Sequence, residues 1–200
     1  MKKGVLTIVF CMATLLAGCT PNSQEGSTSS QGISTSNQVE ATIPEGFEKL
    51  TLTDEQKEKI LTDAKKNGVD QVFVPLYVKK GSSLVAIESG VDDTFDVNHI
   101  QSLWLKFQDE KGDHFIDITE SPELILAGGV VIQEKETKLQ NGIQAKWISY
   151  SNSRDNIKGA SAGLYFQMDK TFIFISGGSN EGIFDKYYEE IAASLQPLKN

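Results

Sequence analysis

Hydrophobic and polar residues follow three different patterns along this 200-residue chain. Residues 5–16 are almost entirely apolar, whereas residues 20–42 consist mainly of Ser, Thr, Gln, Asn and Gly. From residue 43 onward, apolar residues recur either at alternate positions or at the spacing of a helix. The patterns predict a short apolar leader, a polar linker and one folded domain.

A helix is predicted near the start of the folded region. Thr53 and Gln56 have the spacing of a capping box, in which each side chain bonds the other's backbone. Ile60, Leu61 and Ala64 then fall on one side, and Gly68 ends the pattern. We expect a short, highly charged surface helix.

Alternating apolar residues predict several strands after this helix. The candidate strands are residues 72–78, 82–90, 99–107 and 114–120. Pro75 indicates an edge or a bulge in the first, because proline has no amide hydrogen to donate. The pair Lys111 and Gly112 lies between the last two, as a hairpin turn would.

Two further hairpins are predicted in the second half. Residues 130–139 and 143–150 flank Asn141 and Gly142, a pair that favours the positive φ angles of a type I′ turn. Residues 163–168 and 171–176 flank Asp169 and Lys170 in the same way. The chain is then expected to turn through residues 177–180.

A last helix is predicted from a wide apolar stripe that Pro197 ends. The stripe contains Ile183, Phe184, Tyr187, Tyr188, Ile191, Ala192 and Leu195. Such a stripe must be buried, most simply against one face of an antiparallel sheet. The predicted fold class is therefore α+β, with about six to eight strands and one helix from each end of the domain.

The leader has the parts of an export signal. Lys2 and Lys3 precede an apolar run that is too short to cross a bilayer, which takes about 20 residues. Leu16, Ala17, Gly18 and Cys19 resemble a bacterial lipobox, which implies a diacylglyceryl group on Cys19 and cleavage before it. The alternative is an ordinary signal peptide with a chance cysteine. We expect a signal peptide over residues 1–18, a lipidated Cys19 with a tether over residues 19–42, and one domain over residues 43–200.

A lipid on Cys19 would anchor the mature protein to the extracytoplasmic face of the cell membrane, since two acyl chains hold stably where one does not. The polar linker would act as a flexible tether with an r.m.s. length of about 25 Å. Cys11 falls in the removed segment, which excludes disulfides and cysteine nucleophiles in the mature chain.

The net charge of the chain limits the classes of partner that it can bind. The chain has 19 basic and 27 acidic residues, a net charge of -8. A surface this acidic repels phosphate backbones, so nucleic acid is not expected as a partner. Membrane contact is expected through the lipid on Cys19 alone.

The order of several packing and turn motifs is similar to a domain-of-unknown-function family. The matching positions are Glu120-Ser121-Pro122, Asn141-Gly142, Tyr165 with Phe172 and Phe174, and Ala193-Ser194-Leu195. That family occurs in extracytoplasmic parts of Gram-positive lipoproteins and anti-sigma-factor-like membrane proteins. The resemblance implies a strongly curved antiparallel sheet with one or two helices on it, distantly like lipoprotein-carrier and RseB-type half-barrels. It implies no catalytic residues.

Candidate chemistry is sparse. His99 and His114 lack any metal-binding spacing, so solvent or strand-edge positions are the simpler interpretation. The acidic residues Asp92, Asp93 and Asp96 lack the order of a calcium loop, which favours a solvated loop. No motif orders a serine for catalysis. We therefore expect no catalytic residues, no metal and no cofactor.

Two glycine-containing stretches also have simple structural interpretations. Gly128 and Gly129 lack the rest of a phosphate loop and would form a turn before a strand. The stretch Ser176-Gly177-Gly178-Ser179 could present amides to an anion before the last helix. A loop leading to a helix cap explains it equally well.

Aromatic residues are the one feature that could form a binding site. They are dense on the predicted sheet: Trp104, Trp147, Tyr150, Tyr165, Phe166, Phe172 and Phe174. A concave aromatic face could hold a lipid or a peptide, but the favoured interpretation is that these residues form the core beneath the last helix. The predicted function is a non-enzymatic surface lipoprotein that binds or senses a protein, peptide or envelope component. The alternative is a carrier of an apolar ligand such as an acyl chain.

Overall fold

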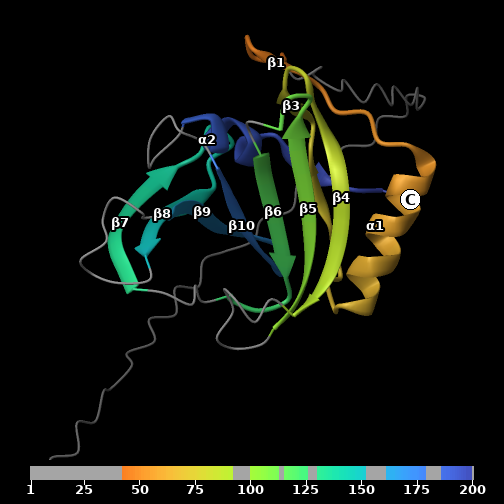
Figure 1. The fold of residues 1–200 in the computed structure, drawn as a ribbon. Helices are drawn as coiled ribbons and strands as arrows, with labels where there is room; N and C mark the ends of the chain where they lie inside the picture. The colour runs from red at the N-terminus through yellow and green to blue at the C-terminus, as the bar shows by residue number, and fades with distance from the viewer. Residues whose placement is uncertain are drawn as a thin grey trace, which may run out of the picture. The chain divides into compact units, whose positions relative to one another are not determined.

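The computed structural model describes residues 42–91, 100–112, 115–125, 130–151, 161–178 and 186–199. Its main element is an open, curved sheet of seven antiparallel strands (Figure 1). In spatial order the strands are β4 (Ser82–Val91), β5 (Gln101–Asp109), β6 (Phe115–Ser121), β10 (Thr171–Gly178), β9 (Ser161–Met168), β8 (Gln144–Ser151) and β7 (Val130–Lys138). The predicted α+β class and strand number are confirmed.

The predicted strand over residues 72–78 divides at Leu76 into two short strands. β2 (Phe73–Pro75) pairs with β11 (Leu195–Pro197), and β3 (Tyr77–Lys79) pairs with β1 (Phe47–Lys49). Both pairs form separate two-stranded sheets. We call the pair β2–β11 the terminal strap, because it joins the beginning of the domain to its end.

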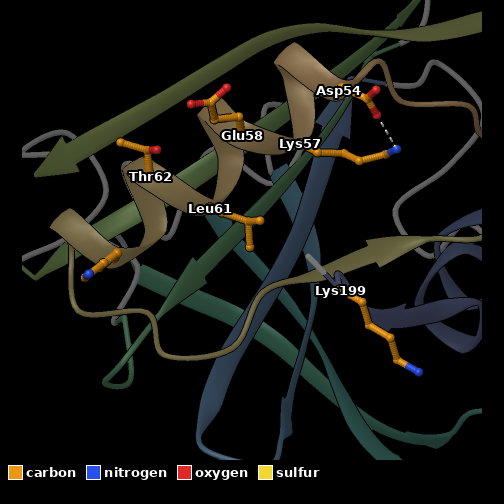
Figure 2. Close-up of a pocket in the computed structure, with 7 residues that line it drawn as sticks. Asp54, Lys57, Glu58, Leu61, Thr62 and Lys199 are labelled. Carbon is orange, nitrogen blue, oxygen red and sulfur yellow. Dashed lines mark hydrogen bonds and ion pairs between the residues drawn. The ribbon is translucent and has the colours of Figure 1, made fainter.

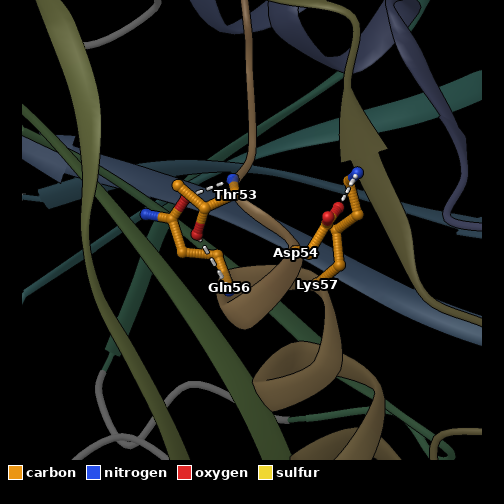
Figure 3. A network of polar contacts seen from close by, with 4 residues as sticks. All are labelled: Thr53, Asp54, Gln56 and Lys57. Carbon is orange, nitrogen blue, oxygen red and sulfur yellow. Dashed lines mark hydrogen bonds and ion pairs between the residues drawn. The ribbon is translucent and has the colours of Figure 1, made fainter.

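Helix α1 (Asp54–Lys66) forms as its capping residues predict. The Gln56 amide donates to Thr53 Oγ1 over 3.1 Å, and the Thr53 amide donates to Gln56 Oε1 over 2.9 Å (Figure 3). Gly68 follows the helix with a φ of 74°, a conformation that glycine adopts without a steric penalty. Ile60 and Ala64 are buried, so the predicted apolar side is confirmed.

Helix α2 (Lys186–Ala193) is shorter than the apolar stripe predicts. Tyr188, Ile191 and Ala192 are buried as expected, but Leu195 and Pro197 belong to strand β11. The extension of the helix was wrong because Leu195 continues the helical spacing by coincidence and is buried by its pairing with Pro75 of β2. The predicted stripe residues Ile183 and Phe184 lie outside the described residues.

The two later hairpins are confirmed, but the first has a different turn. Gly142 has a φ of 88°, while Asp169 is the only non-glycine residue with a positive φ in the described part of the chain. The type I′ assignment was therefore wrong for Asn141. Its side chain instead accepts from the Ile143 amide and donates to the carbonyl of Ala193, both over 3.2 Å, in a longer loop that ends with a left-handed glycine.

Strand register divides the side chains of the sheet between two faces. One continuous row crosses five strands and consists of Leu105, Ile118, Ile175, Leu164 and Trp147. These residues are at most 1% exposed and define the core face. Helix α1 packs on this face beside β4 and β5, and α2 packs beside β8 to β10, where Tyr188 stacks on Trp147 at 5.7 Å.

Candidate functional site

The aromatic residues that the sequence groups together lie on opposite faces of the sheet. Trp147 and Phe166 are on the core face and are 1% and 2% exposed. The other five are half-buried on the opposite face: Trp104, Tyr150, Tyr165, Phe172 and Phe174. We call this surface the aromatic face. The core hypothesis therefore describes Trp147 and Phe166, and the hypothesis of an aromatic face describes the other five residues.

The alternation of strand residues explains the division. Adjacent residues of a strand point to opposite faces, so Tyr165 and Phe166 separate although they are neighbours in sequence. Trp104 separates in the same way from the buried Leu103 and Leu105. Amino-acid composition could not show this, because the separation depends on which phase of each strand faces the helices.

Strand pairing brings the five aromatic residues together on adjoining strands. Trp104 on β5 and Phe174 on β10 both pair with Thr119 of β6, and Phe174 pairs on its other side with Tyr165 of β9. The rings of Tyr165 and Phe172 stack at 6.2 Å with an angle of 10° between their planes. Phe174 and Tyr150 lie 6.3 Å apart. The aromatic face thus spans β5, β6, β10, β9 and β8. Four of its rings adjoin one another, and Thr119 lies between Phe174 and the fifth, Trp104.

Gly163 allows the Phe174 ring to lie against the sheet. A β-carbon at this position would come within 2.2 Å of two carbons of that ring and within 3.1 Å of the Ile175 carbonyl oxygen. A glycine in a strand often marks a close approach of another group to the backbone. Here that group is an aromatic ring, which covers the strand where a side chain would otherwise stand.

Charged side chains border the aromatic face on both sides. Lys106 pairs with Glu88 at 2.8 Å, and Lys146 pairs with Glu134 at 3.1 Å. Asp117 pairs across the strands with Lys106 and with Ser176, so it lies in the row next to the one that contains Trp104, Thr119 and Phe174. Burial raises the pKa of Asp117, Lys106 opposes the rise, and Glu88 adds to it.

The pKa of Tyr165, like that of Asp117, indicates that groups on the aromatic face are partly removed from water. Burial raises the pKa of the Tyr165 hydroxyl to about 12, because the phenolate loses hydration on the half-buried face. The hydroxyl is therefore neutral at physiological pH and can donate a hydrogen bond. The aromatic face combines flat apolar rings with a few polar groups, the composition typical of a binding surface.

A separate groove lies beside α1. It has a volume of about 440 Å³ and is lined by Asp54, Lys57, Glu58, Leu61, Thr62, Lys65 and Lys199 (Figure 2). Asp54 and Lys57 pair with each other at 2.9 Å on its rim. The groove is open to solvent. Five of its seven lining residues are charged and none is aromatic, although most of the surface that they present to the groove is apolar.

Several sequence-based candidates lie outside the described residues: Cys19, Asp92, Asp93, Asp96, His99, His114, Gly128, Gly129 and Ser179. Their hypotheses stay predictions. Ser176 and Gly177 are described, and they belong to β10 rather than to a loop, since β10 continues to Gly178 by pairing with β6. The predicted turn at residue 177 was therefore too early.

Sequence reasoning missed two carboxylates that the structure places in distinctive positions. Asp117 lies on the aromatic face, and Glu120 is 0% exposed on the core face. A signal for Glu120 was present, because it follows Ile116 and Ile118 in the buried phase of the same strand. A charged residue at an apolar phase of a strand indicates either a special environment or a wrong register.

Comparison of the chain with protein-family models, curated proteins and solved structures finds no match. The family resemblance set out under Sequence analysis therefore stays a prediction. In the described part of the chain, no helix is both long and apolar enough to cross a membrane.

Proposed function

We propose that this protein is a non-enzymatic lipoprotein, anchored through Cys19 to the extracytoplasmic face of the cell membrane, that binds a polypeptide segment on its aromatic face. The observation that carries the binding role is the cluster of four adjoining, half-buried aromatic rings, with Trp104 on the same face two strands from Phe174. The anchor rests on the lipobox-like sequence around Cys19. The resemblance to extracytoplasmic lipoprotein domains supports the same location.

The surface favours a partner segment that carries both apolar and cationic groups. Aromatic ring faces carry partial negative charge and attract cations. The ion pairs use Lys106 and Lys146, so Asp117 adds a further carboxylate to a surface whose neighbouring lysines already have acidic partners. The net charge of -8 for the chain attracts a cationic partner over longer distances as well.

An acyl-chain carrier is the second candidate, and the structure supports it less. A carrier needs an apolar cavity, and two of the residues expected to line one, Trp147 and Phe166, pack in the core instead. The groove beside α1 is open to solvent and does not enclose an acyl chain. Titration with a fluorescent fatty acid tests this role, and stoichiometric binding would favour the carrier over the polypeptide binder.

The proposed binding role is tested by adding short peptides of defined charge to the full protein in mild detergent. The probes are a peptide of alternating Lys and Phe and a matched peptide of alternating Glu and Phe. We expect the cationic peptide to change the fluorescence of Trp104, which lies on the aromatic face, and the acidic peptide to leave it unchanged. The Phe172→Ser variant should weaken binding about tenfold, or about 1.4 kcal/mol.

A matched control uses Thr62→Ser in the groove beside α1, which should bind the peptide as the unmodified protein does. Equal binding of both peptides, or equal loss in both variants, would contradict the proposed site. Substitution of Asp117 by Asn separates charge from apolar contact, because it should reduce binding at low salt more than at high salt.

The anchor needs its own experiment. The Cys19→Ser variant should move from the membrane fraction to the soluble fraction of lysed cells, since it loses the only proposed attachment. If this variant still sediments with membranes, the lipid anchor is wrong, whatever the peptide experiment shows.

A further inference from the structure

Glu120 has an unusual environment at the centre of the core face. Its neighbours across the strands are Leu103 on β5 and Ile173 on β10, and all three side chains are 0% exposed. Both carboxyl oxygens lie near one donor, the amide of Phe73, at 3.0 and 3.2 Å. A carboxyl group that would be ionised in water thus lies in an apolar site where, among the described residues, its one hydrogen-bond donor is the Phe73 amide.

An ionised carboxylate is energetically unfavourable in such a site. Burial of the charge without a counter-charge is strongly unfavourable, and a group in this position keeps its proton instead. Burial raises the pKa of Glu120 well above its ordinary value, and the Phe73 amide opposes the rise only in part. Glu120 is therefore a neutral acid under conditions where exposed glutamates are charged.

The described elements around Glu120 bring no opposing charge to it. The residues that face it are Leu103 from β5, Ile173 from β10 and Phe73 from β2. The helices contribute apolar residues and one titratable group to the same core: Ile60, Ala64, Tyr188, Ile191 and Ala192. Tyr188 stacks on Trp147, and its ionisation would add negative charge and not neutralise Glu120.

The hydrogen bond from Phe73 connects the sheet to the terminal strap. A second link comes from Thr171 of β10, whose hydroxyl donates to the Gln71 carbonyl over 2.8 Å. The strap closes on the C-terminal segment through the Leu198 amide, which donates to the Val72 carbonyl over 2.9 Å. Loss of the Glu120 contact would therefore loosen both ends of the domain together.

We propose that Glu120 is a proton-dependent latch that holds the terminal strap on the sheet. While the carboxyl carries its proton, the site is neutral and the strap stays closed. When the proton leaves to solvent, the carboxylate needs water to stabilise its charge. Water reaches Glu120 only when the strap moves away, so deprotonation favours the open strap. The domain thus gains a conformational response to rising pH that does not depend on the proposed binding role.

The sign of the pH effect follows from the raised pKa of Glu120 in the folded protein. Its stabilising contribution is complete below the unfolded pKa and is lost as pH rises through the folded pKa. The free energy of unfolding of the unmodified protein should therefore fall as pH rises from the ordinary pKa of a glutamate toward the raised pKa of Glu120 in the folded protein. In Glu120→Gln, which keeps a neutral hydrogen-bond acceptor, this decrease should be absent.

Amide hydrogen exchange locates the response. At alkaline pH, exchange should be faster in the unmodified protein than in Glu120→Gln for the β2 amides and the Leu198 amide. Comparing the two proteins at the same pH cancels the intrinsic effect of base on exchange. The central strands β5, β6 and β10 should stay protected in both proteins. Glu123→Gln, an exposed glutamate three residues away, is the matched control and should behave as the unmodified protein does.

The same decrease with pH in Glu120→Gln as in the unmodified protein would overturn the latch, and so would equal exchange of the strap amides. If Glu120→Gln does not fold, carbon-13 titration of Glu120 in the unmodified protein decides instead. A carboxyl whose pKa lies well above its ordinary value supports the proposal, and one that titrates at its ordinary value refutes it.

Discussion

The core face and the aromatic face are built from alternate residues of the same strands, yet they have different environments. On the core face, Leu105, Ile118 and Ile175 are 0% exposed beneath α1, the terminal strap and α2. On the aromatic face, Phe172, Phe174 and Tyr165 are half-buried and are bordered by ion pairs. Aromatic content alone therefore does not identify a core, because the helices and the terminal strap that pack on one face decide which face is fully buried.

The polar residues of the two faces differ in the same way. Glu88, Lys106, Lys146 and Glu134 form ion pairs that remain partly in solvent beside the aromatic face. The core face instead contains Glu120, fully buried with one hydrogen-bond donor. The largest energetic effects are therefore expected on the core face, and the effects on binding are expected on the aromatic face.

The two tryptophans provide the strongest contrast between the faces. Trp147→Ala should lower the free energy of unfolding by about 3–5 kcal/mol, since it leaves a cavity and removes the Nε1 hydrogen bond to Glu189. Trp104→Ala should cost about 1 kcal/mol, because its site is half-buried. Urea denaturation measures both, and equal losses would contradict the assignment of one tryptophan to each face.

Gly163 tests the close packing of the aromatic face. Gly163→Ala should destabilise the protein by about 1–3 kcal/mol, because the new β-carbon overlaps the Phe174 ring. The double variant with Phe174→Leu should recover part of this loss, since the smaller side chain vacates the space. Thermal unfolding of the two single variants and the double variant gives the coupling; strictly additive losses would show that the ring does not lie over Gly163.

The helix start at Thr53 tests the layer that covers the core face. Thr53→Ala should lower stability by about 1 kcal/mol, because the Gln56 amide loses its acceptor. Thr51→Ala is the control, as Thr51 is exposed just outside the helix and should change stability little. Urea denaturation of both variants measures the difference, and an equal effect in the two would refute the role of the cap.

The smallest effect is expected for an ion pair beside the aromatic face. Lys146→Met should change stability by about 0.5 kcal/mol or less, because both partners are partly exposed and water screens the pair. The change should shrink further at high salt. A double-mutant cycle with Glu134→Gln measures the coupling, and a large value independent of salt would show that this border is buried.

Much of the fold could be predicted from local patterns. The capping residues Thr53 and Gln56 predict where α1 begins, and strand alternation in residues 99–107 and 114–120 predicts β5 and β6. These features depend on neighbours in sequence. The extension of α2 failed because Leu195 meets its partner, Pro75 of β2, only through the fold.

The candidate site could be predicted only in part. The sequence shows that aromatic residues are dense on the sheet, but it cannot assign Tyr165 and Phe166 to their faces without knowing where the helices pack. Likewise, Glu120 stands out by its phase in the strand, but its single donor, Phe73, comes from 47 residues away.

The sequence by itself determined the class of fold and most of the strand and helix positions, because periodicity and capping act over a few residues. It also carries the lipobox-like motif at Cys19 on which the proposed anchor rests. Only the tertiary structure decided which aromatic rings are core and which form a surface, and why Glu120 is held without a counter-charge. The physical reason is that burial is set by contacts between segments far apart in the chain, and these contacts exist only after the sheet has formed.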